Sequence, residues 1–336
     1  MFKQTVLPRW RGFNILGVFV MNSPGRFDEE DFQMTADLGF DFVRLPLNYT
    51  FWIDHNDPFA ISESKLDVVD QAVNWGEKYG LHVNIGFHRG PGFSVARDRV
   101  EPFDLWTDAE GLDAFVLHWK AFAKRYKGIS NEKVSFNMLN EPAKVSTENH
   151  SRVMRTTIAA IHEIDPERYC ILDGLNYGTV PMFELGDMAK DNVGQSCRAY
   201  IPHGITHYRA LHVDNQFKLP EQPTWPNAYH ERYPHIGWWD EERLGNYFKA
   251  WAALAATFNM GVHCGEGGAY NMTPQEPLMG WLEFVLDQLK TYNIGFAMWN
   301  LRGQFGIIDS NRPGAQYVDY RGRQLDKRMY DLMKKY

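Results

Sequence analysis

Two carboxylates in this sequence follow apolar runs directly. Glu141 comes after the run Val134 to Asn140, and Glu266 comes after the run Gly261 to Gly265. Cleavage of a glycosidic bond needs such a pair, because one carboxyl group protonates the departing oxygen while the other attacks or activates water. A separation of about 5 to 5.5 Å gives retention, and one of about 6.5 to 9.5 Å gives inversion. The pair therefore indicates glycoside hydrolysis, and its stereochemical outcome depends on a distance that a sequence does not contain.

Other residues able to contact a substrate stand at equivalent positions, where further apolar runs end. A packed core would not place charged and amide groups there, whereas a substrate site would. A lone glutamate could simply form a salt bridge with a loop arginine, but two glutamates on opposite strands, with an amide beside one of them, favour a site. These further residues are Arg44, His88, Asn140, Arg198, Tyr200, Trp299 and Asn300.

The elements that must position these residues alternate along the whole chain as apolar runs and amphipathic stretches. Continuously apolar runs predict strands buried on both faces, as in a parallel sheet covered by helices. Eight such units favour an α/β fold, a single-domain (β/α)8 TIM barrel over residues 1 to 336, rather than an open doubly wound sheet. An irregular stretch from about 202 to 240 is expected as an extended loop after the sixth strand, on the face where the active site of such a barrel is built.

The expected strands are Gly12 to Phe19, Phe42 to Asn48, His82 to His88, Val134 to Asn140, Cys170 to Asp173, Gly194 to Tyr200, Gly261 to Gly265 and Ile294 to Trp299. The expected helices are Glu29 to Leu38, Ser64 to Tyr79, Ala109 to Tyr126, His150 to Ile164, Met182 to Ala189, Glu241 to Phe258, Glu276 to Tyr292 and Asp326 to Lys334.

Six motifs in chain order resemble one known family. The stretch from Phe136 to Pro142, Phe-Asn-Met-Leu-Asn-Glu-Pro, resembles the Asn-Glu-Pro signature of glycoside hydrolase family 5. This family is a group of retaining barrel enzymes with catalytic glutamates on strands four and seven. The stretches similar to its first, second, third, seventh and eighth strands are Arg11 to Asn14, Phe42 to Pro46, Phe87 to Arg89, His263 to Gly268 and Phe296 to Trp299.

The resemblance implies catalytic roles for the two carboxylates. Glu141 would be the general acid/base and Glu266 the nucleophile. Asn140 would hydrogen-bond the sugar 2-hydroxyl, a contact that strengthens as positive charge develops at the anomeric carbon. The chemistry needs no cofactor and no metal.

The resemblance also implies supporting roles around the carboxylates. Tyr200 would donate a hydrogen bond to Glu266, and Arg44 would keep Glu266 ionised by its charge, while Glu141, in a drier place, stays protonated. His88 and Trp299 would shape the subsite for the distorted sugar, Trp299 by stacking on its apolar face. His88 could instead be a hydrogen-bonded histidine behind the site.

The end of the sixth strand departs from the family pattern. Many members have His-x-Tyr there, whereas this chain has Arg198-Ala199-Tyr200. Arg198 could donate directly to a substrate hydroxyl, which is the favoured expectation, or it could pair with Glu141 and alter its pH range. His203 or His207 could take over the role of the missing histidine. The variant is similar to members that act on β-1,4-mannan, or on both mannan and glucan.

Aromatic residues make up 15% of the chain, and part of them falls in strand-to-helix loops. Tryptophan and tyrosine rings bind the C–H face of a sugar with little loss of side-chain freedom. We therefore expect a sugar-binding surface around Glu141 and Glu266, with about half of the loop rings packing their loops instead. The loop rings are Trp52, Phe93, Trp106, Trp225, Trp238, Trp239 and Tyr270, whereas Trp75, Trp119, Trp251 and Trp281 are expected in the core.

Charge and motifs exclude several other classes. The net charge of −7 disfavours nucleic acid or anionic lipid as a partner. His203, His207 and His212 suggest zinc, but their spacing lacks the glutamate of H-E-x-x-H, so loop histidines are the preferred interpretation. Because Met1 to Arg11 has no apolar segment of signal-peptide length, we expect a cytoplasmic protein, or a secreted one if a leader has been removed.

These observations predict a retaining glycoside hydrolase that cleaves β-1,4-linked hexose chains, mannan or glucan, by double displacement. Its partner would be a β-linked oligo- or polysaccharide. Two other hypotheses stay open. A carbohydrate-binding barrel without activity would bind such chains and release no sugar, and a metal-dependent barrel hydrolase would lose activity in excess chelator.

Overall fold

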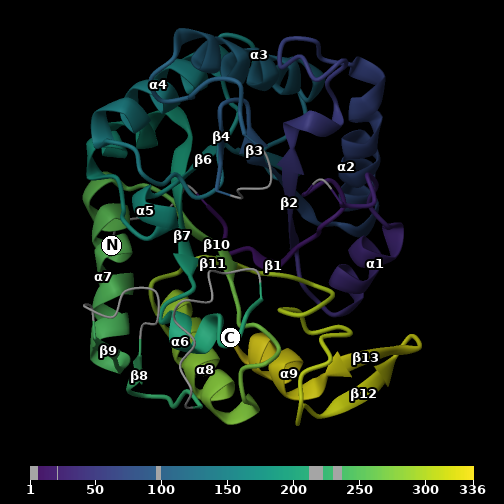
Figure 1. The fold of residues 1–336 in the computed structure, drawn as a ribbon, viewed down its shortest axis with the longest axis vertical. Coiled ribbons are helices and arrows are strands. Elements are labelled where there is room, and N and C mark those ends of the chain that lie inside the picture. The colour runs from purple at the N-terminus through teal and green to yellow at the C-terminus, as the bar shows by residue number, and fades with distance from the viewer. Residues whose placement is uncertain (1–6, 21, 96–99, 212–221, 230–236) are drawn as a thin grey trace.

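The computed structural model describes residues 7–20, 22–95, 100–211, 222–229 and 237–336 (Figure 1). Within these residues, eight parallel strands close into a barrel in the ring order β1, β2, β3, β5, β6, β7, β10, β11, and β1 pairs again with β11. The predicted (β/α)8 TIM barrel is therefore confirmed. The strands are β1 (Arg11–Asn14), β2 (Phe42–Asn48), β3 (His82–Gly90), β5 (Val134–Asn137), β6 (Cys170–Asp173), β7 (Val193–Ala199), β10 (Val262–Gly267) and β11 (Gly295–Met298).

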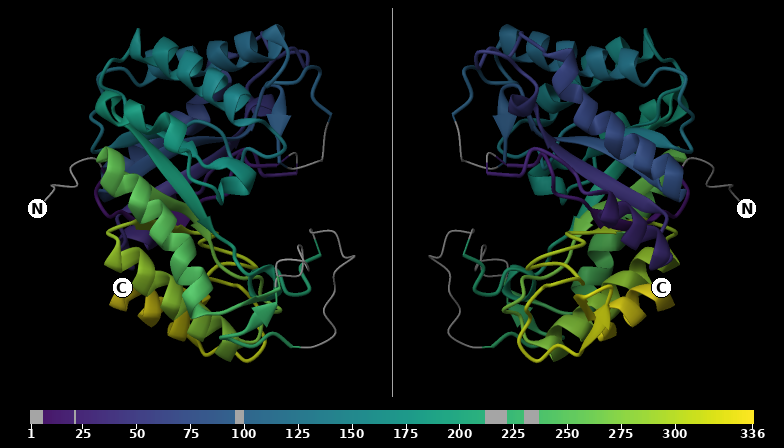
Figure 2. Two further views of the ribbon diagram at one scale, coloured as in Figure 1. Left: turned by 90° about the vertical axis from the view of Figure 1, so that its left-hand side faces the viewer. Right: turned by 90° about the vertical axis from the view of Figure 1, so that its right-hand side faces the viewer.

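Helices cover the outside of the strands. The side views show α2 to α4 around one part of the barrel and α7 to α9 around the other (Figure 2). None of the described helices is long and apolar enough to cross a membrane. The covering elements are α1 (Glu29–Asp37), α2 (Asp67–Tyr79), α3 (Ala109–Arg125), α4 (Thr147–His162), the 3₁₀ helix Phe183–Asp191, α7 (Glu241–Phe258), α8 (Gln275–Thr291) and α9 (Lys327–Lys335).

Short elements lie in the connections between barrel strands and covering helices. Two 3₁₀ turns follow β2, and a small antiparallel pair, β12 with β13, precedes α9. Another antiparallel pair, β8 with β9, precedes α7. These elements are β4 (Phe93–Ser94), α5 (Leu175–Gly178), α6 (His203–Thr206), β8 (Ala228–Tyr229), β9 (Trp238–Trp239), β12 (Tyr317–Tyr320), β13 (Arg323–Asp326) and the turns Tyr49–Phe51 and Glu63–Leu66.

Local sequence signals explain where several helices begin. The carboxylate of Asp240 accepts from the backbone N–H of Arg243 at 2.9 Å and caps α7, and Ser146 caps α4 in the same way. Such caps satisfy backbone donors that a helix leaves unpaired at its start. Along α8, the buried apolar residues recur at helical spacing and face the barrel. They are Leu278, Trp281, Leu282, Val285, Leu286 and Leu289.

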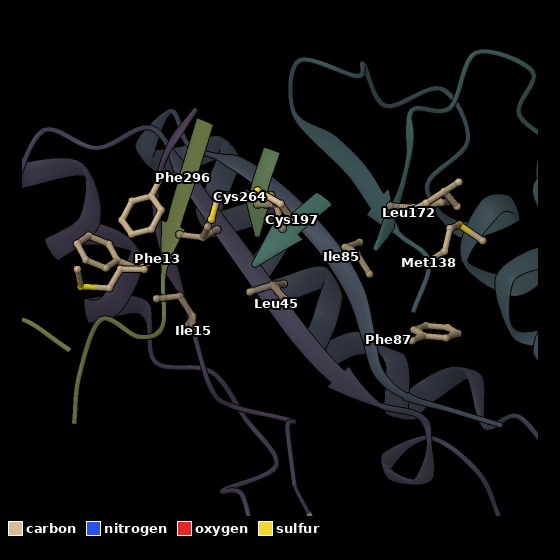
Figure 3. Packing of buried hydrophobic residues seen from close by; sticks show 14 of the residues in the cluster. Phe13, Ile15, Leu45, Ile85, Phe87, Met138, Leu172, Cys197, Cys264 and Phe296 are labelled. Atoms are coloured by element: carbon tan, nitrogen blue, oxygen red, sulfur yellow. The ribbon is translucent and has the colours of Figure 1, made fainter. Parts of the chain in front are cut away.

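Alternation along each strand separates two cores. In β2, Val43 and Leu45 belong to the layer between strands and helices, which Figure 3 shows for Leu45 and its neighbours from other strands. Because successive side chains point to opposite faces, Phe42 and Arg44 share the inner face of the barrel. Phe42 packs in a separate inner cluster with Trp10 and Tyr169. Apolar residues therefore fill the inner cluster around Phe42, and polar residues follow along the same face toward the strand ends.

Most predicted elements begin and end within three residues of the observed bounds, and two differ more. β1 ends at Asn14 rather than at Phe19, because the chain after Asn14 leaves the ladder with β11 and follows β2 by single backbone hydrogen bonds, from Ile15 to Arg44 and from Asn48 to Val18. In place of the predicted helix Met182 to Ala189 the structure has the 3₁₀ helix Phe183–Asp191. That segment includes Gly186 and Asp187, which are poor α-helix formers.

Candidate active site

The two carboxylates predicted from the sequence lie in one buried network. Glu266 is within β10, and Glu141 follows β5 after three irregular residues. The guanidinium group of Arg198 contacts both, with Nε 3.3 Å from Glu141 Oε1 and Nη2 3.4 Å from Glu266 Oε1. The Glu141 side chain retains 15% exposure and that of Glu266 retains 4%. The barrel thus brings together residues that are 125 positions apart in the sequence.

Arg44 connects Glu266 to three amides. Its Nη1 donates to Glu266 Oε1 at 2.7 Å and to Asn14 Oδ1 at 2.9 Å. Its Nη2 donates to Asn140 Oδ1 at 2.9 Å, and its Nε donates to Asn137 Oδ1 at 2.8 Å. Burial lowers the pKa of Arg44, and the adjacent charge of Glu266 opposes that effect. Arg44 is thus placed to hold the Glu266 carboxylate and the Asn140 amide in fixed positions.

Arg198 does not have the predicted contact with substrate. Its side chain is buried, and all five N–H groups of the guanidinium have acceptors within the protein. Nε donates to Glu141, Nη1 to Ser196 Oγ and to the Cys197 carbonyl, and Nη2 to Asn140 Oδ1 and to Asp173. The expectation that Arg198 donates to a sugar hydroxyl is therefore wrong in this structure, and the alternative, an ion pair with Glu141, is the arrangement found.

Asp173 is a site residue that was not among those predicted. It ends β6 and is 1% exposed. Its Oδ2 accepts from Arg198 and from the backbone N–H of Glu141 at 2.8 Å, and its Oδ1 accepts from Asn137 Nδ2 at 3.0 Å. The signal in the sequence was the same as for Glu266, an ionisable residue that ends an apolar run. Asn14 and Asn137 were likewise not predicted, because amides within strands show no such signal.

Tyr200 follows β7 and lies against Glu266. Its hydroxyl donates to Glu266 Oε2 at 3.1 Å. Burial, and then the charge of Glu266, raise the pKa of Tyr200 well above its ordinary value. The phenol therefore stays protonated and remains a donor. The Tyr200 ring packs beside Phe305 and His207, so an aromatic wall borders Glu266.

His88 and Trp299 lie together, as expected for neighbouring residues of one subsite. Their rings stack with centroids 5.8 Å apart, and Phe19 packs edge-on against both. Burial, and then the charges of Arg44 and other arginines, lower the pKa of His88 well below its ordinary value, so the ring is neutral. Trp299 is only partly buried. Its indole therefore retains exposed surface next to the network.

The environment of Glu141 differs from that of Glu266. Burial, and then the charge of Glu266, raise the pKa of Glu141 to about 8. At neutral pH Glu141 therefore carries a proton that it can donate. Next to it, Asn140 is buried, and its Nδ2 has no hydrogen-bond partner in the described part of the chain. This amide has a donor available beside the carboxyl pair.

More of the loop aromatic rings pack against the protein than the expected half. Trp52, Trp106, Trp239 and Tyr270 are buried. The first three belong to the core, where Trp52 Nε1 donates to His118 in α3. Phe93 and Trp225 are partly buried against the core, as is Trp75 in α2. Among the loop rings, Trp238 is largely exposed, at 62%. Trp119, Trp251 and Trp281 are in the core, as predicted.

The histidines that suggested zinc are only partly described. His203 and His207 lie at and directly after α6, with ring centroids 4.4 Å apart, and His212 is outside the described residues. Within the described ranges, no group of three or more His, Cys, Asp or Glu side chains is placed to hold a metal ion.

The fold and the site together define a class of protein. A closed (β/α)8 barrel with one carboxyl group after its fourth strand, another in its seventh, and amide and aromatic groups around them is a glycoside hydrolase arrangement. The family model described as "Cellulase (glycosyl hydrolase family 5)" matches residues 3–304. The chain belongs to glycosyl hydrolase family 5.

Relatives and solved structures agree with this membership. The chain is 26% identical to endoglucanase C of Acetivibrio thermocellus over 300 residues, which is 84% of this chain and 87% of that protein. It is 26% identical to cellodextrinase A of Ruminococcus flavefaciens over 76% of this chain and 73% of the relative. A crystal structure of a glycoside hydrolase superposes with a TM-score of 0.91 at 34% identity, over 97% of this chain and 99% of that one. Cel5A of Thermotoga maritima, in complex with cellobiose, shares the fold at a TM-score of 0.78 and 21% identity, over 97% and 96%.

Proposed function

We propose that this glycoside hydrolase cleaves β-1,4-linked hexose chains with retention, using Glu141 as acid/base and Glu266 as nucleophile. One observation supports the assignment above all others. The two carboxyl groups share one network, yet Glu266 accepts hydrogen bonds from Arg44 and Tyr200, whereas burial raises the pKa of Glu141 to about 8. One group is prepared to attack as an anion and the other to donate a proton.

In the first step Glu266 attacks the anomeric carbon, and the bond from that carbon to the leaving oxygen breaks. The proton on Glu141 moves to the leaving oxygen, and a glycosyl ester forms on Glu266. Asn140 supports this step, because its Nδ2 has no hydrogen-bond partner among the described residues and can donate to the sugar 2-hydroxyl. Trp299 offers an apolar surface for the sugar ring.

In the second step water replaces Glu266 at the anomeric carbon. The charge of Glu266 is one cause of the raised pKa of Glu141, and that charge is absent while Glu266 is esterified. Glu141, now ionised, can therefore accept a proton from the attacking water. Cleavage of the ester restores the Glu266 carboxylate, and Glu141 again holds a proton.

The substrate class is proposed from the relatives. Endoglucanase C and cellodextrinase A match most of the chain, which favours β-1,4-glucan and its oligosaccharides. Mannan is the second candidate, since structures of Thermotoga maritima Cel5A include one complex with cellobiose and one with mannotriose. Initial rates on cello- and manno-oligosaccharides of equal length decide between them. A rate on cellotetraose below that on mannotetraose would reverse the proposed preference.

Chemical rescue tests the two roles. With an activated aryl glycoside and added azide, Glu266→Ala is expected to give the α-glycosyl azide, since azide replaces the nucleophile. Glu141→Ala is expected to give the β-glycosyl azide, since azide then replaces water at the ester. Glu266→Gln is expected to lose several orders of magnitude in kcat. Near-normal turnover by Glu266→Gln, or the opposite pair of azide products, contradicts the assignment.

The two other hypotheses have separate outcomes. Binding of cello- and manno-oligosaccharides by the wild type without release of shorter sugars over hours would establish a binding barrel instead. Loss of activity in excess chelator, with recovery on addition of a divalent metal, would establish a metal-dependent hydrolase.

A further inference from the structure

Three carboxylates and two arginines meet in one buried network inside the barrel. Arg44 comes from β2, Asp173 from β6, Arg198 from β7 and Glu266 from β10, and Glu141 follows β5. Glu141, Glu266 and Arg44 have roles in the proposed catalytic steps. The buried Asp173 and Arg198, which lie in the same network, have none in those steps.

We propose that Asp173 and Arg198 form an ion pair that positions Glu141 and sets the pH range in which it acts as the acid. This proposal rests on the proposed function, because it assumes that Glu141 is the acid/base. Asp173 and Arg198 are positioning residues in it, since the structure shows each of them contacting Glu141 and neither exposed to the space where a substrate would bind.

The positioning role follows from two contacts on Glu141. Its backbone has φ of 49°, in the left-handed region that a glutamate rarely adopts. Asp173 Oδ2 accepts from the backbone N–H of Glu141 at 2.8 Å, and Arg198 Nε donates to its Oε1 at 3.3 Å. One member of the pair therefore holds the main chain of Glu141 and the other holds its carboxyl group. Because Asp173 and Arg198 also bind each other, the two contacts form one unit.

The electrostatic role follows from the balance of buried charges. The groups that act on Glu141 are Glu266, Arg198, Asp173 and Arg44, with the neutral hydroxyl of Tyr200 nearby. With Glu141 protonated, two arginines balance Glu266 and Asp173. Ionisation of Glu141 leaves one uncompensated negative charge in a buried place, which is unfavourable.

Arg198 keeps its charge in this arrangement. Burial alone would lower its pKa, but the charges of Asp173, Glu266 and Glu141 raise the pKa above the ordinary value. Asp173 thus makes it possible to bury a permanent cation between two catalytic carboxylates. Without Asp173, the positive charge of Arg198 would favour ionisation of Glu141.

Removal of one or the other member of the pair is therefore expected to shift the alkaline limb of the pH profile of kcat/KM in opposite directions. This limb reports ionisation of the acid in the free enzyme. In Asp173→Asn a negative charge is lost, so Glu141 ionises more easily and the limb moves to lower pH. In Arg198→Met a positive charge is lost, so the limb moves to higher pH. Each shift is expected to be about one pH unit or more. The double variant removes both charges, and its limb is expected to lie between those of the single variants.

The experiment measures pH profiles of the full chain on an unactivated tetrasaccharide, cellotetraose or mannotetraose, whichever the wild type cleaves faster. Asp165→Asn is the matched control. Asp165 pairs with the buried Arg168 at 2.9 Å just before β6, and Arg168 also donates to three backbone carbonyls. This variant loses a buried ion pair away from the network, so its limb is expected to stay at the wild-type pH.

A second substitution keeps the test decisive if Arg198→Met does not fold. Arg198→Lys keeps the charge but cannot form the same set of hydrogen bonds. It is expected to fold, to lower kcat and to leave the limb within a few tenths of a pH unit of wild type, while Arg198→His, the residue common in the family, moves the limb upward.

Limbs that stay at the wild-type pH in both single variants, or that move in the same direction, overturn the inference. Glu266→Gln and Glu141→Gln in the same assay separate this failure from a failure of the proposed function. If both lose turnover while the limbs do not separate, the catalytic assignment stands and only the ion-pair proposal fails.

Discussion

Glu141 and Glu266 have the same side chain, and their surroundings give them different chemistry. Glu266 receives hydrogen bonds from a guanidinium and a phenol. The Glu141 side chain is more exposed than that of Glu266, 15% against 4%, and burial with the charge of Glu266 still raises its pKa to about 8. Residue type thus supplies two equal carboxyl groups, and the local contacts decide which one holds a proton at neutral pH.

The hydrogen bond from Tyr200 to Glu266 leads to a prediction at this scale. Tyr200→Phe removes a donor 3.1 Å from Oε2, and a hydrogen bond to a charged group contributes about 1.5–3 kcal/mol. We expect kcat/KM to fall by about 10- to 100-fold, as measured by initial rates.

Tyr208→Phe is the control for this prediction. Tyr208 is also buried, and its hydroxyl has no hydrogen-bond partner among the described residues. Its variant is expected to keep the wild-type rate. Equal losses in the two variants would show that removing any buried phenol here disturbs the site and that the bond to Glu266 has no special role.

At the scale of elements, the barrel requires β1 and β2 to approach each other closely. Gly12 in β1 is paired with Phe42 in β2. A methyl carbon at Gly12 would lie 1.7 Å from the carbonyl oxygen of Phe42. Only glycine therefore allows β1 to lie against β2 at this position and bring Asn14 beside Arg44.

Gly12→Ala is expected to lower the free energy of unfolding by about 3 kcal/mol or more, because the clash is with backbone and no side chain can move aside. Gly245→Ala in α7 is the control, since there the nearest atoms to a methyl carbon lie at 3.7 Å. That variant is expected to gain about 0.5–1 kcal/mol from helix propensity. Denaturant unfolding of both variants and wild type measures the difference, and an equal effect of the two substitutions would contradict the close-approach argument.

At the scale of the whole molecule, the active site reduces stability at alkaline pH. The pKa of Glu141 rises from 4.5 in an ordinary glutamate to about 8 in the folded protein. The folded state therefore binds this proton more tightly than the unfolded state does. The free energy of unfolding falls as pH increases between those two values.

Glu141→Gln removes this dependence. The Tm of the variant is expected to exceed that of wild type by more at pH 9 than at pH 5, as measured by thermal unfolding at both pH values. Glu276→Gln is the control, because its hydrogen bond to Arg328 lowers the pKa of this exposed carboxyl. The contribution of Glu276 is complete above its unfolded pKa, so its variant should differ from wild type by the same amount at pH 5 and pH 9. A constant Tm difference for Glu141→Gln would contradict the raised pKa.

The sequence by itself determined the fold class and most of the elements. Continuous apolar runs predicted β2 and β6, and helical periodicity predicted α7, with the bounds that the structure has, because these strands are buried on both faces and the helix on one. The apolar pattern predicted β1 too long, because apolar residues after Asn14 are buried without belonging to the strand. It also pointed to Glu141 and Glu266, since ionisable residues directly after apolar runs have little reason to be in a core.

Only the tertiary structure decided how these residues are connected. Arg198 is an internal cation and not a substrate donor, and Asp173 is its partner, although both follow the same local pattern as Glu266. Trp52 and Trp106 are buried although they lie in loops on the predicted substrate face. The direction of a side chain and the identity of its neighbours depend on contacts between residues far apart in the chain. Local sequence patterns contain no such contacts, and closure of the barrel creates them.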